Sequence, residues 1–220
     1  MAYPDIYPGA KYVGSPNFTP GRQGFGPEAV IWHIADGTLA GMDSWFNNPA
    51  SQVSATFGIG DGTDGFADGE IHQYTYISNT AWANGKIEAG YTAALIDENG
   101  GVNPNVWSVP IEFAGKGGSL PTPKQTAAGV ALTAWLFTDV LLKSGASGVA
   151  VDRKHILRHS EISPVTRSNC PGWPEPVLAM MVEAVKARVE GVDIKTYEQG
   201  VKDGIAKAVA AANAAWSGLQ

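Results

Sequence analysis

Three residues of this chain have side chains that suit a transition metal. His33 ends an apolar run, His159 opens an irregular segment, and Cys170, the single cysteine, lies further along that segment. Neutral imidazole and thiolate are donors that Zn(II) favours, and a catalytic zinc site uses three protein ligands so that a fourth position stays open. A lone cysteine is more often an inert buried residue. The spacing alone therefore leaves two interpretations: a zinc site, or two histidines and a thiol with structural roles.

The elements that must position these residues follow from the hydrophobic pattern. Residues 29–34 are β-branched and aromatic and end in turn residues, which is typical of a buried strand, so His33 lies near a strand's carboxyl end. Further strands are predicted at 53–59, 70–76, 89–96, 107–113 and 155–159, and helices at 39–46, 123–143 and 176–189. The pattern predicts a mixed α/β fold, with a central β-sheet covered by helices.

The chain divides into three predicted parts. Residues 1–28 are rich in Pro, Gly and aromatics and predict an irregular N-terminal arm, whereas residues 29–190 hold the α/β domain. Residues 191–220 contain an amphipathic helix, 197–216, whose apolar stripe needs a surface to pack on. That helix docks on its own domain or joins two copies, so both a monomer and a weak homo-oligomer remain open.

Composition limits the partners and the compartment. The 220 residues carry 15 Lys and Arg against 21 Asp and Glu, a net charge of −6, which argues against nucleic-acid binding because that requires clustered basic residues. The sequence has no signal-peptide pattern and no uninterrupted apolar run of about 20 residues, so no stable membrane insertion is expected. One cysteine excludes an intramolecular disulfide. These features predict synthesis in the cytoplasm.

Several motifs resemble those of a known enzyme family. The segment 159–172, which ends in Cys170-Pro171-Gly172, resembles the late zinc-binding segment of the N-acetylmuramoyl-L-alanine amidases of the amidase-2 type. That family includes T7-like phage lysozymes and peptidoglycan recognition proteins. Residues 31–33 resemble its first ligand strand, 81–85 its Ala-Trp-His-Ala-Gly motif, and 110–113 the strand that carries its catalytic Glu. The motifs keep the family's order over about residues 29–189.

The resemblance implies a zinc enzyme. It places Zn²⁺ on His33, His159 and Cys170 and makes residues 29–190 a catalytic domain that hydrolyses the amide between N-acetylmuramic acid and L-alanine. Zinc with two neutral histidines and one thiolate stays positive, so it acidifies water and polarises a carbonyl. Glu112 is then the candidate to move the proton from water to the leaving amine. Its alternative is a solvated, outward side chain, since side chains alternate along a strand.

Other positions are assigned through the same resemblance. Arg167 occupies a basic position before the third ligand, where relatives often have Lys, and is expected to stabilise an oxyanion; the alternative is a surface arginine. Thr56 stands near a cleft position that is commonly His or Tyr, and is expected to contact substrate, whereas Ala83 replaces the motif's His. Trp82 is the tryptophan best suited to line a sugar or peptide groove. Trp32, Trp45 and Trp107 are expected to lie mostly in the hydrophobic core.

The remaining histidines are left outside the zinc site. His155 lies four residues before His159, and on a strand that even spacing places both on one face without making a metal pair. His72 and Tyr74 share a predicted strand and are expected to be structural side chains with satisfied hydrogen bonds.

Together these features favour a zinc amidase that cleaves peptidoglycan. An endolysin of a phage or prophage fits best, because it needs neither a signal peptide nor disulfides and reaches the cell wall after release. A cytosolic amidase that recycles soluble muropeptides is the alternative, and acidic charge favours it because cell walls are anionic. A non-catalytic peptidoglycan-binding module is a third possibility, against which Cys170 argues because such relatives lose a zinc ligand.

Overall fold

The computed structural model describes residues 3–191 and is built around a six-stranded sheet of order β1-β5-β4-β7-β3-β8. All neighbouring strands are parallel except β4 and β5, which are antiparallel, so the sheet is mixed, as predicted. Residues 192–220, with the predicted helix 197–216, lie outside the described residues. The strands are β1 (Lys11–Tyr12), β3 (Ala29–Ile34), β4 (Phe57–Ile59), β5 (Ile71–Gln73), β7 (Ser108–Phe113) and β8 (Ile156–Arg158).

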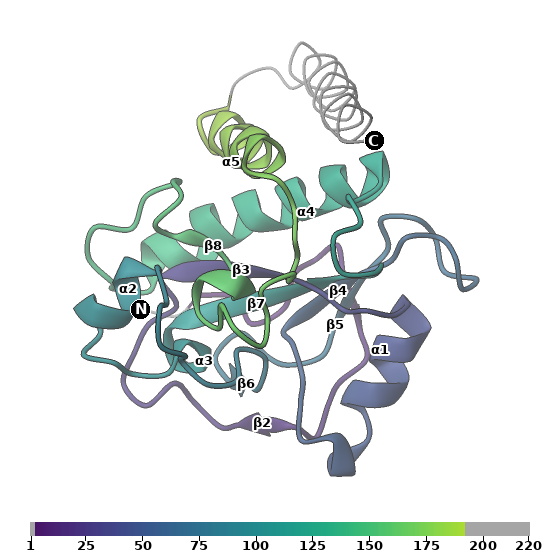
Figure 1. Ribbon diagram of the computed structural model, residues 1–220, viewed down its shortest axis with the longest axis horizontal. Helices are drawn as coiled ribbons and strands as arrows, with labels where there is room; N and C mark the ends of the chain where they lie inside the picture. Colours follow the sequence, from purple (N-terminus) through teal and green to yellow (C-terminus); the bar gives the residue numbers. More distant parts are fainter. Residues whose placement is uncertain (1–2, 192–220) are drawn as a thin grey trace.

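Helices cover both faces of this sheet (Figure 1). On one side lie α4 (Pro123–Trp135) and α5 (Glu175–Val189), with α5 packed on α4. On the other side lie α1 (Leu39–Phe46), α3 (Pro104–Trp107) and a ribbon formed by β2 (Phe18–Thr19) and β6 (Thr80–Ala81). The layers confirm the predicted fold class.

The long helical segment over residues 123–143 starts where its sequence predicts. The Thr122 side chain accepts the Gln125 backbone N–H, the Gln125 side chain accepts the Thr122 N–H, and Pro123 occupies the first turn. A π-helical turn (Leu136–Val140) and a 3₁₀ turn (Leu141–Lys143) continue α4. By length and composition this segment is able to cross a membrane, but 61% of its apolar window is buried within the protein. It is the core helix of the domain.

The predicted strand at 89–96 is wrong. Gly90 has a φ of +87°, and the short helix α2 (Ala94–Glu98) follows it. Leu95 and Ile96 are both buried in one cluster with Trp107. A helical turn lets two adjacent side chains enter the same core, whereas a strand points them to opposite faces. A short apolar run does not distinguish the two structures, and here tertiary packing decided.

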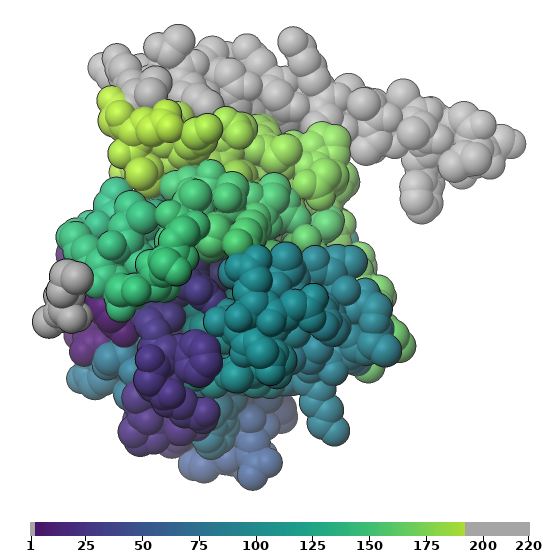
Figure 2. Space-filling view, turned by 90° about the vertical axis from the view of Figure 1, so that its left-hand side faces the viewer, coloured from purple at the N-terminus to yellow at the C-terminus, as the bar shows by residue number. Residues whose placement is uncertain are grey.

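The chain from residue 3 to residue 28 is largely irregular, and hydrogen bonds tie it to the rest of the fold. It adds β1 to the sheet edge and β2 to the ribbon. The buried Arg22 side chain donates to the backbone carbonyls of Ile77 at 2.6 Å and of Val106 and Ser108 at 2.9 Å. In Figure 2 the early, purple part of the chain accordingly lies against the teal segment that contains α2 and α3. The arm therefore helps to fix the end of α3 and the start of β7.

Candidate metal centre

Neighbouring parallel strands bring the predicted site residues to one edge of the sheet. His33 on β3 stands directly opposite Glu112 on β7, and β8 pairs with the other side of β3 and ends at Arg158, one residue before His159. The carboxyl ends of parallel strands meet at the same edge, where open α/β sheets place their ligands. Residues far apart in sequence thus meet through strand order.

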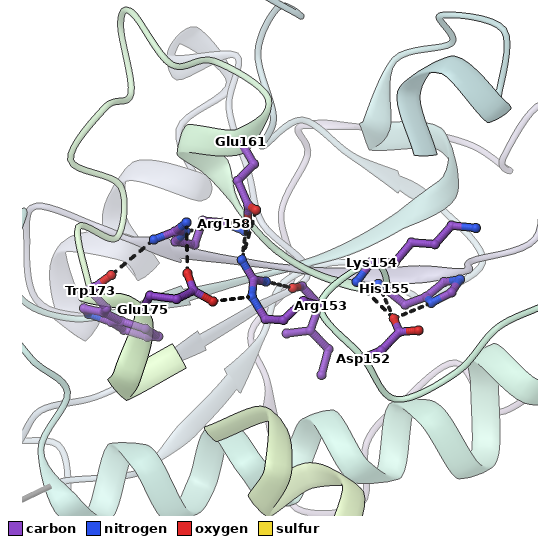
Figure 3. Close-up of polar contacts among 9 residues, drawn as sticks. Asp152, Arg153, Lys154, His155, Arg158, Glu161, Trp173 and Glu175 are labelled. Atoms are coloured by element: carbon purple, nitrogen blue, oxygen red, sulfur yellow. Dashed lines mark hydrogen bonds and ion pairs between the residues drawn. The ribbon is translucent and has the colours of Figure 1, made fainter. Parts of the chain in front are cut away.

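An ion-pair network fixes the turn that carries His159 (Figure 3). Arg153 Nη2 lies 2.9 Å from Glu161 and its Nε lies 3.2 Å from Glu175 at the start of α5. Arg158 reaches the same two carboxylates, with Nη2 3.3 Å from Glu175 and Nε 3.6 Å from Glu161. A network restrains its members better than an isolated surface pair does. The 3₁₀ turn His159–Glu161 is therefore held between β8 and α5.

The structure brings His33, His159 and Cys170 together. Their candidate ligand atoms all lie within 4.8 Å of one another, and the two imidazole centroids are 4.4 Å apart. The backbone N–H of Ile34 donates to Cys170 Sγ at 3.4 Å, which orients the sulfur toward the end of β3. Two imidazole nitrogens and one sulfur at this spacing match the donor set of a three-ligand zinc site.

Burial sets the protonation of these three groups. It holds the pKa of His33 well below its usual range, with a further contribution from neighbouring His159, and it lowers the pKa of His159 to about 4. Both rings are therefore neutral at pH 7, which is the form that binds metal. Burial also raises the pKa of the Cys170 thiol to about 12, so a metal ion must displace the thiol proton on binding.

Glu112 lies beside the cluster and is not the outward, solvated side chain of the alternative. Its Oε1 is 3.7 Å from His33 Nδ1, and its side chain is 14% exposed. Its Oε2 is buried without a hydrogen-bond partner among the described residues. Burial raises the pKa of Glu112 to about 8, although the positive charge of Arg167 opposes the shift. A buried carboxyl with a free oxygen and a pKa near neutrality suits proton transfer.

A cavity of about 530 Å³ opens over these groups. Glu112, His159, Cys170 and Arg167 line it, as do the α1 residues Met42, Trp45 and Phe46. Trp45 is 55% exposed, which contradicts its expected place in the core. The reason is that α1 buries Leu39, Met42 and Phe46, and Trp45 lies outside that stripe. The part of the cavity wall that α1 supplies is therefore partly aromatic.

Of the other expected site residues, Arg167 and Trp82 lie at the cavity and Thr56 does not. Arg167 is exposed at the cavity, and Trp82 lines it while its indole N–H donates to Thr19 Oγ1 at 2.9 Å. Thr56 is fully buried, and its hydroxyl lies 3.4 Å from that of Thr75. Backbone bonds to Pro110 and Tyr74 hold Thr56 inside the sheet. The expectation that Thr56 contacts substrate is therefore wrong.

Asn84 is a site residue that sequence reasoning missed. Its side-chain Oδ1 lies 3.1 Å from His33 Nε2, and its backbone carbonyl lies 3.1 Å from His159 Nε2. The side chain is fully buried. Its place inside the motif 81–85 was the one available signal, because an isolated Asn in a loop otherwise reads as a turn residue.

The two remaining histidines lie outside the cluster, as expected. His72 is bonded to Asp43 and Glu70, and His155 Nδ1 lies 2.7 Å from Asp152 (Figure 3). Tyr74 is fully buried and its hydroxyl donates to Asp43 at 2.9 Å. All three side chains have structural partners.

Comparisons with known proteins agree with this geometry. The family described as N-acetylmuramoyl-L-alanine amidase (amidase-2) matches residues 23–173. N-acetylmuramoyl-L-alanine amidase A of Achromobacter lyticus is 35% identical over 80 residues, which span 36% of this chain and less than half, 42%, of that protein. A selenomethionine derivative of AmpD has a similar fold, with a TM-score of 0.60 at 19% identity over 84% of this chain and 99% of that one. PlyL gives a TM-score of 0.52 at 16% identity over 82% and 97%. With its family model matched over most of its length, the chain belongs to the amidase-2 family of N-acetylmuramoyl-L-alanine amidases.

Proposed function

We propose that this protein is a zinc-dependent amidase that hydrolyses the bond between N-acetylmuramic acid and L-alanine in peptidoglycan. The observation that carries the proposal is the meeting of His33, His159 and Cys170 within 4.8 Å, beside Glu112, at the wall of a cavity. Family membership supplies the bond that is cut. The neutral imidazoles and the displaceable thiol proton supply a donor set that fits zinc.

Zinc held by these residues supplies Lewis acidity, which polarises an amide carbonyl and acidifies water. The Glu112 carboxylate, which lines the cavity, would accept the proton of the attacking water and return it to the nitrogen of the departing L-alanine. Arg167 places a positive charge at the cavity, where it stabilises negative charge developing on the carbonyl oxygen. Trp82 offers an apolar surface to the sugar or the stem peptide.

Within this activity we propose the role of an endolysin. The protein is then made in the cytoplasm and reaches the cell wall of the host when lysis begins. Its alternative is the recycling of soluble muropeptides, which the net charge of −6 favours because anionic cell walls do not attract an acidic enzyme. Rates on intact sacculi and on soluble muropeptides separate the two roles. An endolysin cleaves sacculi at least as well as fragments, whereas a recycling enzyme acts on fragments alone.

The experiment that tests the amidase itself follows two products released from purified sacculi. New α-amino groups report amide cleavage, and new reducing ends report cleavage of glycan. The zinc-loaded protein should release amino groups without reducing ends, lose this activity when a chelator strips the metal, and regain it on addition of zinc. Muropeptide binding without release of either product would contradict the proposal and favour a binding module.

A further inference from the structure

We propose that Asn84 is a positioning residue that sets the tautomer of both metal-binding histidines, so that each presents Nδ1 as its free lone pair. The inference rests on the proposed zinc site, and it concerns a residue that does not contact the metal. A neutral imidazole carries one N–H and one lone pair, and a hydrogen bond at one nitrogen decides which nitrogen remains for a ligand.

The tautomer of His159 follows directly from its partner. Its Nε2 lies 3.1 Å from the backbone carbonyl oxygen of Asn84. A carbonyl oxygen only accepts, so Nε2 carries the proton and Nδ1 keeps the lone pair. The backbone at this point is itself held, because Asn105 Oδ1 accepts the N–H groups of Ala83 at 3.1 Å and of Asn84 at 2.8 Å.

The tautomer of His33 follows from a chain of three hydrogen bonds. The Ser108 hydroxyl donates its single proton to the Pro104 carbonyl at 2.7 Å, so its oxygen must accept from its other neighbour. That neighbour is the Asn84 side chain, whose Nδ2 lies 3.1 Å away, and this contact fixes the orientation of the amide. Asn84 Oδ1 therefore faces His33 Nε2, which must donate to it.

Without Asn84 the ring of His33 has a competing arrangement. Its Nδ1 lies 3.7 Å from Glu112 Oε1, just beyond hydrogen-bond distance, so a small rotation of either side chain would give a proton on Nδ1 an acceptor. In that tautomer the nitrogen nearest the catalytic carboxyl has no lone pair to give to a metal. The Asn84 side chain is fully buried, so bulk solvent does not compete with it as the acceptor for Nε2 in the wild type. One residue thus commits two histidines to the same ligand nitrogen, through its side chain for His33 and its main chain for His159.

The first test uses metal-free wild-type protein and requires no activity. Long-range ¹H–¹⁵N correlation spectra of ¹⁵N-histidine protein distinguish the two neutral tautomers, and His33→Gln and His159→Gln spectra assign the signals. Both rings should be protonated at Nε2. A proton on Nδ1 of either ring in the wild type would overturn the inference.

The second test compares variants. Asn84→Ala removes the acceptor of His33 but keeps the main-chain carbonyl, so His33 should gain the Nδ1–H tautomer while His159 keeps its own. Zinc affinity, measured by competition with a chromophoric chelator, should fall about 10–100-fold, as is typical when a hydrogen-bond partner of a metal ligand is removed. Ser108→Ala, which frees the amide to turn, should show a smaller loss in the same direction.

Asn103→Ala is the matched control. Asn103 donates to the carbonyl of Gly85, the residue after Asn84, at 2.7 Å, and its Oδ1 accepts the Asn105 N–H at 2.9 Å. Among the described residues it makes no hydrogen bond to either histidine. It should keep wild-type tautomers and zinc affinity. Equal losses in Asn103→Ala and Asn84→Ala would overturn the inference, as would wild-type affinity in Asn84→Ala. A wild type that shows both Nε2–H tautomers but no zinc binding would contradict the zinc proposal and leave the tautomer assignment standing.

Discussion

Two fully buried histidines on the same sheet have opposite environments. His33 on β3 has an amide oxygen at Nε2 and only the distant Glu112 carboxyl, 3.7 Å away, at Nδ1. His72 on β5 has a carboxylate at each nitrogen, Asp43 at 2.8 Å and Glu70 at 3.1 Å. Both side chains are at most 1% exposed, so burial by itself does not distinguish them. Their partners do.

The difference extends to the carboxyl groups. Hydrogen bonds from the Ala67 backbone and from His72 lower the pKa of Glu70, whereas burial raises the pKa of Glu112 to about 8. Around His72 each described polar group is matched, which is what stabilises a fold. Around His33, by contrast, Glu112 Oε2 is buried without a hydrogen-bond partner among the described residues, and the Cys170 sulfur makes only long contacts with the backbone of Ile34, at 3.4 and 3.9 Å. Unmatched buried groups are where function is to be sought.

The largest expected effect tests this contrast at the thiol. Cys170→Ala removes one of three metal donors, so bound zinc should disappear and amide hydrolysis should fall to the level of chelator-stripped protein. Zinc content after dialysis and amine release from sacculi measure the two. His155→Ala, a buried histidine paired with Asp152 outside the cluster, is the control and should keep its zinc. Full activity in Cys170→Ala would exclude Cys170 as a ligand.

A smaller loss is expected at the carboxyl group. Glu112→Gln keeps the size of the side chain but removes its ability to accept a proton, so turnover should fall by about 10²–10⁴-fold while zinc remains bound. Steady-state rates together with zinc content separate this effect from metal loss. An unchanged rate would remove Glu112 from the mechanism.

The two glutamates should also give opposite pH dependences of stability. The pKa of Glu112 is about 8 in the folded chain against an ordinary 4.5, so between these values the folded state holds a proton that the unfolded state has released. Stability therefore falls as pH rises through this range. Above pH 8 the free energy of unfolding of metal-free Glu112→Gln should exceed that of the metal-free wild type by on the order of a few kcal/mol. Below pH 4.5 the two free energies should be equal.

Glu70→Gln is the counterpart in the same denaturation series. Because its pKa is lowered in the folded chain, Glu70 contributes stability above its unfolded pKa that is lost as pH falls through its folded pKa. The variant should therefore be less stable than the wild type at neutral pH and approach it in acid. If the stabilities of Glu112→Gln and Glu70→Gln, each relative to the wild type, changed with pH in the same direction, the contrast between the His33 and His72 regions would be contradicted.

The smallest effect on activity is expected at His72. His72→Leu leaves Asp43 and Glu70 without a shared partner, which should cost about 1–3 kcal/mol of unfolding free energy. Chemical denaturation measures this cost, and zinc content and hydrolysis at low temperature should remain those of the wild type. Loss of zinc in a folded His72→Leu protein would mean that the two regions are coupled.

Much of this site could be predicted from the sequence because its signals are local. The run that ends at His33, the largely apolar run 107–113 that contains Glu112 and the Thr122-Pro123 helix start each depend on a few adjacent residues, and the structure has β3, β7 and α4 there. The chemistry of imidazole and thiol then limited the candidate metal, and motif order supplied the family.

Other assignments failed for a physical reason that recurs. The predicted strand at 89–96 is instead a turn followed by the start of α2 at Ala94, because Leu95 and Ile96 enter one core. Trp45 is exposed because its neighbours fill the buried stripe of α1, and Thr56 is covered by its partner strands. Each outcome depends on a surface that another segment supplies.

The sequence by itself therefore determined the candidate donors, namely which side chains have the chemistry to hold a metal or move a proton, and the strands that carry His33 and Glu112. Only the tertiary structure decided how the side chains of those donors are oriented. Asn84 meets His33 across 51 positions and His159 across 75, and hydrogen bonds between segments so far apart leave no periodicity in the sequence, because strand order and loop packing, not local propensity, bring their atoms together.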